Sequence, residues 1–333
     1  MSKTKLFLTI AGALCAVGLV LSAVSFSCMG FDIKKISASP QLEEKSYSVN
    51  AEEITEINIH SEELKIRLVP TSGSEIQVHY SEGEQYSCEI SAENGMLSVD
   101  FKNRARWFDT FRYGIFKDFN FVDRQILVEV PADYSGAVRL HNENAPIRVN
   151  DVSLKNLECQ TSNSAIEIEN ATAEKVSAIT SNGSVSLIGV TSADQLIAKN
   201  SNGAIRSIDI QAADATINTS NGSVSLEDMK IDTLNTSNSN GKISLKNVAA
   251  SESLSAVTSN GAIQVDRLSG TDLSLRTSNG KVSGTIAGKE SDYGIIANTT
   301  NGSNNLEGRI AQSDKILTIS NSNGGIHITF TEQ

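Results

Sequence analysis

The chain has 333 residues, of which 39% are hydrophobic and only 5% are aromatic, and its formal net charge is −11. So little aromatic mass argues against a thick globular core and favours thin, polar layers of chain. The acidic balance argues against nucleic acid as a partner, because phosphate binding depends on Lys and Arg.

The first segment is an uncharged run from Leu6 to Phe31, preceded by Lys3 and Lys5. This run is long enough to cross a bilayer as a helix. It is also longer than the apolar core of about 7 to 15 residues that is usual in a signal peptide. We therefore expect a transmembrane signal-anchor over residues 6–31, with residues 1–5 in the cytoplasm and the rest of the chain outside it.

Two alternatives for this segment stay open. Ser25 and Ser27 precede Cys28 in the small-residue pattern that a signal peptidase reads, which would suit a cleaved signal peptide. Cys28 could also be the lipidated residue of a lipoprotein, although Ser25 then stands where an apolar residue is usual.

Polar residues of mixed charge follow, and residues 32–50 are interpreted as a stalk. Residues 51–136 then show short alternating apolar runs separated by turn-rich segments. We expect this N-terminal β region to begin and cap the repeats that follow. Cys88 in this region and Cys159 beyond it are candidates for a disulfide in an oxidising compartment.

One segment of this region, residues 101–121, mixes aromatic and basic side chains. Such a segment could fold back as a cap over the first coil, or contact an anionic membrane or polymer. The candidate contact residues are Arg104, Arg106, Trp107, Phe108, Phe111, Arg112 and Tyr113.

From residue 137 onward, one sequence motif is repeated ten times at intervals of 19 to 22 residues. The motif begins with two apolar residues spaced by two, continues with Thr or Asn, a small residue and Asn-Gly, and ends with a second apolar pair. Such a period is the mark of a repeat architecture, and the alternation indicates strands with one buried face. The origin of each copy is Asn144, Asn163, Asn182, Asn202, Asn221, Asn240, Asn260, Asn279, Asn301 or Asn323.

The spacing predicts an all-β fold, a parallel β-solenoid of about ten coils with an N-terminal β cap, over residues 137–333. Antiparallel hairpins are the alternative, because Asn-Gly is a favoured hairpin turn whose residues tolerate positive φ. Hairpins would require far more short strands in one sheet than the roughly ten that open twisted sheets usually hold.

In a solenoid, equivalent side chains stack in columns. Buried amides and hydroxyls must be hydrogen-bonded, and stacked identical side chains can bond along the column. We therefore interpret the repeated Asn as a structural ladder in sequence order, with Asn323 at its end, and expect the Thr/Asn column two residues earlier to bond in the same way. The ladder residues are Asn163, Asn182, Asn202, Asn221, Asn240, Asn260, Asn279, Asn301 and Asn323.

Residues that carry chemistry form no motif. The four histidines are scattered, with no metal-binding spacing among His and Cys. The densest acidic group, which includes Asp209 and Asp228, is interpreted as a solvated corner. We expect no cofactor, no metal and no catalytic site.

Three features together resemble a known family: the anchor followed by Met29-Gly30-Phe31-Asp32, the Leu127–Pro131 strand, and the run of Thr-Ser-Asn-Gly phrases. The chain resembles the bacterial β-strand-repeat family of unknown function labelled "putative adhesin", over about residues 45–333. The resemblance implies tethering outside the cytoplasm, and the family offers no catalytic motif to transfer.

Three functions are weighed. The first is a non-catalytic, membrane-tethered structural or adhesive module that contacts a cell-envelope polymer or a surface or membrane protein. The second is an accessory or sensory protein of an envelope-stress system that acts on a membrane partner. The third is a carbohydrate-active β-helix enzyme, for which the mainly Ser, Thr and Asn outer positions supply no clustered carboxylates.

Overall fold

The computed structural model describes residues 3–28, 43–83, 86–103, 124–306 and 313–331. These residues divide into two compact units, one containing the helix α1 (Lys3–Cys28) and the other all the strands. Each unit is described by itself.

Helix α1 is apolar along its whole length, and side chains such as Phe7 and Leu19 are exposed. Its segment Lys5–Ser25 is long and apolar enough to cross a membrane. A signal sequence near an N-terminus meets the same criteria, so the helix is a candidate for either.

Within the described residues, the second unit contains twenty strands and two short 3-10 helices. Its N-terminal strands are β1 (Glu43–Asn50), β2 (Glu56–Ser61), β3 (Lys65–Thr71), β4 (Glu75–Glu82), β5 (Tyr86–Glu93), β6 (Met96–Asn103) and β7 (Gln125–Pro131), with η1 (Ala51–Glu53). The central strands are β8 (Ala137–Asn142), β9 (Ile147–Ser153), β10 (Asn156–Thr161), β11 (Ile166–Thr180), β12 (Val185–Lys199), β13 (Ile205–Thr219), β14 (Val224–Asn238), β15 (Ile243–Thr258) and β16 (Ile263–Thr277). The C-terminal strands are β17 (Val282–Ala287), β18 (Tyr293–Thr299), β19 (Lys315–Asn321) and β20 (Ile326–Thr331), with η3 (Glu290–Asp292).

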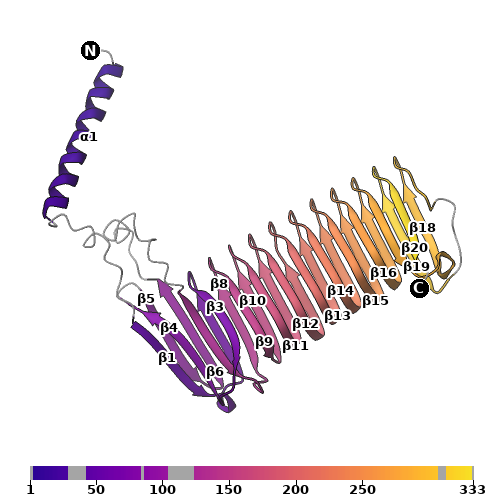
Figure 1. Cartoon of the computed structure of the whole chain (residues 1–333), viewed down its shortest axis with the longest axis horizontal. Helices are drawn as coiled ribbons and strands as arrows, with labels where there is room; N and C mark the ends of the chain where they lie inside the picture. The colour runs from indigo at the N-terminus through magenta and orange to yellow at the C-terminus, as the bar shows by residue number, and fades with distance from the viewer. Residues whose placement is uncertain (1–2, 29–42, 84–85, 104–123, 307–312, 332–333) are drawn as a thin grey trace. The chain divides into compact units, whose positions relative to one another are not determined.

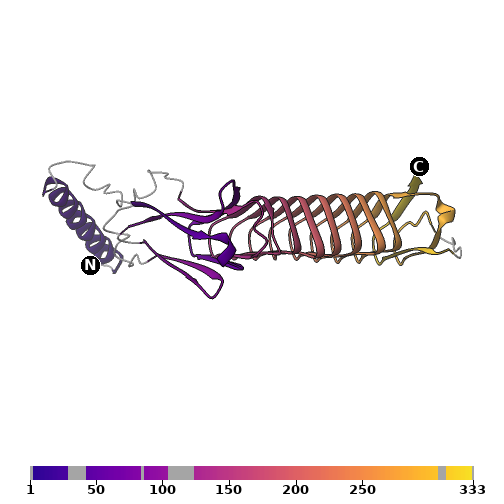
Figure 2. The same ribbon diagram turned by 90° about the horizontal axis from the view of Figure 1, so that it is seen from below.

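The central strands stack in parallel, each displaced from the last by one repeat (Figures 1 and 2). Leu157 pairs with Val176, which in turn pairs with Leu196, so equivalent residues form columns. All three side chains are buried, because alternate residues of a strand point into the coil. The chain is a parallel β-solenoid, as the repeat predicts, and the hairpin alternative is excluded because successive copies pair in parallel.

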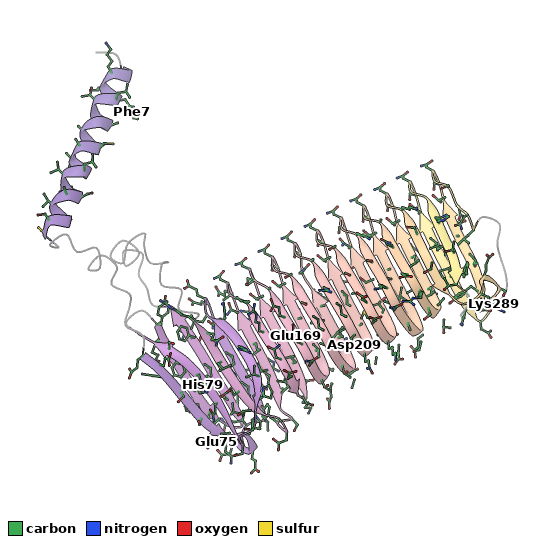
Figure 3. All side chains as sticks on the ribbon, in the orientation of Figure 1. Phe7, Glu75, His79, Glu169, Asp209 and Lys289 are labelled. Atoms are coloured by element: carbon green, nitrogen blue, oxygen red, sulfur yellow. The ribbon has the colours of Figure 1, made fainter. Side chains whose placement is uncertain are left out.

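Seven successive coils, from β9 to β16, also share a column of residues with positive φ. Aspartate and asparagine predominate there, since their short polar side chains tolerate this backbone better than most. The column consists of Asp151, Asn170, Gly189, Asp209, Asp228, Asn247 and Arg267. Asp209 and Asp228 thus lie at a solvent-exposed corner, and Figure 3 labels Asp209 there.

The turn glycines have a different role from the one expected. Gly183, Gly222 and Gly280 are not among the residues with positive φ. A Cβ built on Gly222 would lie 1.7 Å from the carbonyl oxygen of Gly203 in the adjacent coil. These glycines are needed because neighbouring coils approach too closely for a side chain, so the explanation from positive φ is wrong.

The N-terminal end contains coils that the repeat motif does not mark. Strands β2 and β3 stack in parallel between β8 and β9 on one side and β6 and β7 on the other. Antiparallel strands complete this end, with β5 on β6, β4 on β7 and β1 on β4. Residues 43–50, interpreted from sequence as part of the stalk, form β1, whose register with β4 runs from Glu43 opposite Glu82 to Asn50 opposite Glu75.

The C-terminal coils do not stack in sequence order. Strand β19 pairs with β16 on one side and with β18 on the other, and β20 pairs with β17. The last repeat of the sequence therefore lies between the two repeats that precede it in the chain. Leu317 of β19 is fully buried, with Leu273 of β16 and Ile295 of β18 as its in-register partners. The expectation that Asn323 ends the stack is wrong.

Candidate functional site

The expected Asn ladder is present as a chain of side-chain amides along the turns. Each Nδ2 donates to the Oδ1 of the Asn in the adjacent coil at 2.7 to 2.9 Å. At the N-terminal end, Asn144 Nδ2 donates to the Glu62 carbonyl at 3.2 Å. At the other end, Asn323 donates to Asn279 and Asn301 donates to Asn323, so Asn301 is the terminal member.

All members of the ladder are exposed, so the premise that this column is buried is wrong. The Thr/Asn column is buried, but its side chains bond to backbone instead of to each other. Asn238 Nδ2 donates to the Gly222 carbonyl at 2.6 Å, and its Oδ1 accepts from the backbone of its own turn. Thr180 bonds in the same way through Oγ1. Both residue types suit the position because each combines one acceptor with at least one donor on a short side chain.

We expect Asn240→Ala to be about twice as destabilising as Asn301→Ala. The first change removes two amide–amide hydrogen bonds and the second only one, and each bond contributes about 0.5–1.5 kcal/mol. Asn323→Ala should match Asn240→Ala, because Asn323 also bonds on both sides. Urea titration of the three variants measures this, and a smaller loss at Asn323 than at Asn301 would contradict the observed coil order.

Cys88 and Cys159, the candidates for a disulfide, are both free thiols in the structure. Burial raises the pKa of Cys88 to about 12, and burial also raises the pKa of Cys159, which lies inside the coil. Because the thiolate is the reactive form, we expect iodoacetamide at about pH 8 to spare both thiols in the folded chain and to modify both after unfolding. Labelling of Cys88 should accelerate as the pH rises towards 12. Peptide mass spectrometry reads the result, and a peptide pair linked through Cys88 and Cys159 would contradict it.

The residues proposed for the aromatic contact loop lie outside the described part of the chain. They are Arg104, Arg106, Trp107, Phe108, Phe111, Arg112 and Tyr113. Their assignment, as a cap or as a contact surface, stays a prediction.

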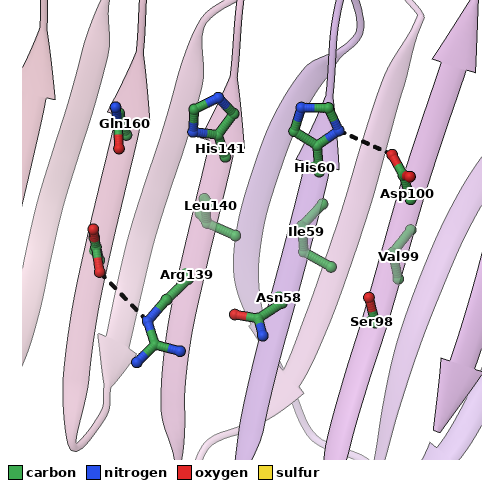
Figure 4. Close-up of a pocket in the computed structure, with 11 residues that line it drawn as sticks. Asn58, Ile59, His60, Ser98, Val99, Asp100, Arg139, Leu140, His141 and Gln160 are labelled. Atoms are coloured by element: carbon green, nitrogen blue, oxygen red, sulfur yellow. Dashed lines mark hydrogen bonds and ion pairs between the residues drawn. The ribbon is translucent and has the colours of Figure 1, made fainter.

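The structure also forms a groove that the sequence analysis missed, with a volume of about 360 Å³. It lies on the outer face of four neighbouring parallel strands, in the order β6, β2, β8 and β10 (Figure 4). Alternation places Ile59, Val99 and Leu140 inside the coil. The polar residues between them point outward and line the groove.

One row of the groove contains Asp100, His60, His141 and Gln160, which are in-register neighbours (Figure 4). The rings of His60 and His141 stack with centroids 5.1 Å apart. His60 Nδ1 lies 2.9 Å from Asp100 Oδ1, and Lys102 Nζ lies 2.9 Å from the other oxygen of the same carboxylate. Burial raises the pKa of Asp100, but hydrogen bonds from Lys102 and His60 outweigh this effect and lower the pKa below its ordinary value. Asp100 is thus a carboxylate with a fixed orientation.

The second row contains Ser98, Asn58, Arg139 and Glu158. The Arg139 guanidinium donates through Nη1 to Glu56, and its Nε lies 3.4 Å from Glu158 Oε2. Asn58 Nδ2 donates to the same Glu56 oxygen at 2.9 Å. These contacts orient the guanidinium along the groove.

The groove suits hydrogen-bonded recognition. Its side chains offer both donors and acceptors at close spacing. In the described part of the chain, no group of three or more His, Cys, Asp and Glu side chains is arranged to hold a metal ion. Nor does a Ser hydroxyl or Cys thiol bond to either stacked imidazole within those residues.

Two of the histidines that are scattered in the sequence therefore meet in the structure. One signal could have revealed this. Residues 57–66 form a degenerate copy of the repeat, with Ile57 and Ile59 as the apolar pair and Glu63 in place of the Asn. That alignment places His60 in the column of His141.

The described residues form a parallel β-solenoid with a polar groove on its outer face. The Toastrack DUF4097 family matches residues 54–194 and again residues 188–332. The chain belongs to this family, which is consistent with the resemblance noted in its sequence. No curated protein matches the chain.

Three solved structures are similar to the chain. A "putative adhesin" from Parabacteroides merdae ATCC 43184 is 13% identical, with 87% of this chain and 96% of that chain covered and a TM-score of 0.47. One from Parabacteroides distasonis ATCC 8503 is 14% identical, with 88% and 98% covered and a TM-score of 0.43. One from Bacteroides fragilis NCTC 9343 is 12% identical, with 87% and 98% covered and a TM-score of 0.43.

Proposed function

We propose that the chain is a non-catalytic binding or adhesive module of the cell envelope. Helix α1 would hold it in the membrane, with residues 1–5 in the cytoplasm and the solenoid outside. The observation that carries the binding role is the polar groove across β6, β2, β8 and β10, whose Asp100 and Arg139 side chains are held in place by ion pairs. Orientation of polar groups before a ligand arrives reduces the entropy cost of binding.

The apolar, uncharged run of α1 after Lys5 supports the tether. An accessory role on a membrane partner is the alternative, and it depends on the aromatic loop outside the described residues.

Photo-crosslinking on intact cells tests this proposal. A photoreactive residue replaces Gln160 in the groove, and a matched control carries it at Asn235, an exposed position on the same outer face outside the groove. We expect the Gln160 probe to capture envelope material and the Asn235 probe to capture much less.

Protease added to the same cells should remove the solenoid and leave a membrane-bound fragment containing α1. A protected solenoid would refute the topology. Failure of the Gln160 probe to capture more material of any class than the Asn235 probe would refute the binding role.

A further inference from the structure

We propose that the groove binds a short segment of an uncharged polysaccharide that lies across the four strands, along the solenoid axis. This inference rests on the proposed binding function and gives its ligand a chemical class. The groove crosses three strand spacings of about 4.8 Å, so its length is on the order of 14 Å. That length accommodates a few linked sugar rings.

The groove cannot take up an extra β-strand, which is a common way to bind a peptide. Strand β2 is already paired with β6 and β8, and β8 is also paired with β10. Strand β6 is paired with β5 on its other edge. With the backbone groups of these strands used within the sheet, a ligand must be recognised through side chains.

The groove also lacks the apolar pocket that usually anchors a protein side chain. Ile59, Val99 and Leu140 contribute to its floor, but their exposed fractions are only 2%, 1% and 1%. The exposed side chains end in hydroxyl, amide, imidazole, carboxylate and guanidinium groups, with aliphatic and ring carbons between them. Such a surface matches a ligand rich in hydroxyl or amide groups.

The charges disfavour a polyanion. Arg139 is paired with Glu56 and Glu158, and Lys102 is paired with Asp100 and Glu89. A phosphate or carboxylate would have to displace one of these partners and would then lie beside the remaining carboxylates. An uncharged ligand avoids both costs.

The same ion pairs favour hydroxyl recognition. A carboxylate held by a cation retains free lone pairs, and a guanidinium held at Nη1 and Nε retains free N–H groups. Gln160 adds an exposed amide that makes no hydrogen bond within the described part of the chain. Neighbouring hydroxyls of a sugar can bridge such donor and acceptor pairs.

The test uses the full chain in lipid nanodiscs, because sugar-headed detergents would compete. The probes are neutral cello-, malto- and chito-oligosaccharides of two to four sugar units, with oligogalacturonates as acidic comparators. We expect at least one neutral series to bind in calorimetry, with affinity rising with length until the groove is filled. Gln160→Ala and His141→Ala should each weaken that binding on the order of tenfold, the loss expected for one good hydrogen bond.

Asn235→Ala is the matched control, since it truncates an exposed amide on the same face without touching the groove, and it should bind as the unaltered chain does. Equal melting temperatures exclude unfolding as the cause of weaker binding. Absence of binding to every neutral series, binding of the acidic series alone, or unchanged affinity in both groove variants would each overturn the proposal. Crosslinking of a protein at Gln160 on cells, with no neutral sugar bound in vitro, would overturn this inference and leave the binding function standing.

Discussion

Leu317→Asp is expected to lower the free energy of unfolding by several kcal/mol and to unfold the C-terminal coils together. Leu317 is fully buried between β16 and β18, and a carboxylate there is either charged without a partner or protonated with unmet hydrogen bonds. In the described residues β19 is the only strand paired with β18, so the damage should spread to β18. Denaturant unfolding measures the loss, and hydrogen exchange should show faster exchange at Tyr293–Thr299.

Ile316→Asn is the control for this change. Ile316 precedes Leu317 on the same strand, but its side chain points outward and is 41% exposed, so the new amide stays solvated. Asn is used because Asp272 of β16 is the in-register neighbour of Ile316, and a carboxylate there would add a like charge directly beside it. Its effect on stability should be within about 0.5 kcal/mol. Retained exchange protection in β18 of the Leu317→Asp chain would show that β18 does not depend on β19, contrary to the observed pairing.

Gly222→Ala is expected to destabilise the central coils by about 3 kcal/mol, the upper part of the usual range for overpacking. The new Cβ would lie 1.7 Å from the oxygen and 2.3 Å from the carbon of the Gly203 carbonyl. Both are backbone atoms, so no change of side-chain rotamer can relieve the overlap. The two coils must separate, which also lengthens the hydrogen bond between the side-chain amides of Asn202 and Asn221.

Two further variants identify the cause. Gly73→Ala should be nearly neutral, because the nearest atom to its Cβ would be 3.8 Å away. Gly222→Asn should be at least as damaging as Gly222→Ala, since close approach excludes any side chain. If thermal unfolding shows that Asn is tolerated and Ala is not, the glycine is needed for its backbone conformation after all.

The sequence predicted the structure best where the same type of residue recurs in one column, because every coil places that residue in the same environment. The alternation of Leu157 and Cys159 with polar neighbours is enough to place these side chains inside a coil. The ladder was also inferable, because the Asn recurs at the coil period. Its exposure was not, since hydrogen bonding along a column is compatible with either a buried or a solvated turn.

The groove was missed because one of its coils is a degenerate copy of the repeat. His60 and His141 come from coils that are distant in the chain, and the first of these coils carries Glu63 in place of the marker Asn. The corner with positive φ was similarly hidden, because Asp, Asn, Gly and Arg all occupy it. Because the residue type varies along this column, its shared backbone conformation is visible only in the three-dimensional structure.

The sequence by itself determined the class of fold, the length of a coil and the faces of its strands, because strand alternation and a constant period are local properties. Only the tertiary structure decided which coils are neighbours at the two ends. Stacked coils present nearly the same apolar columns to each other, so Leu317 could pack on Leu273 as well as Ile295 could. The apolar columns therefore leave the order of the end coils open, and only the tertiary pairing places β19 between β16 and β18, and β2 between β6 and β8, where His60 meets His141.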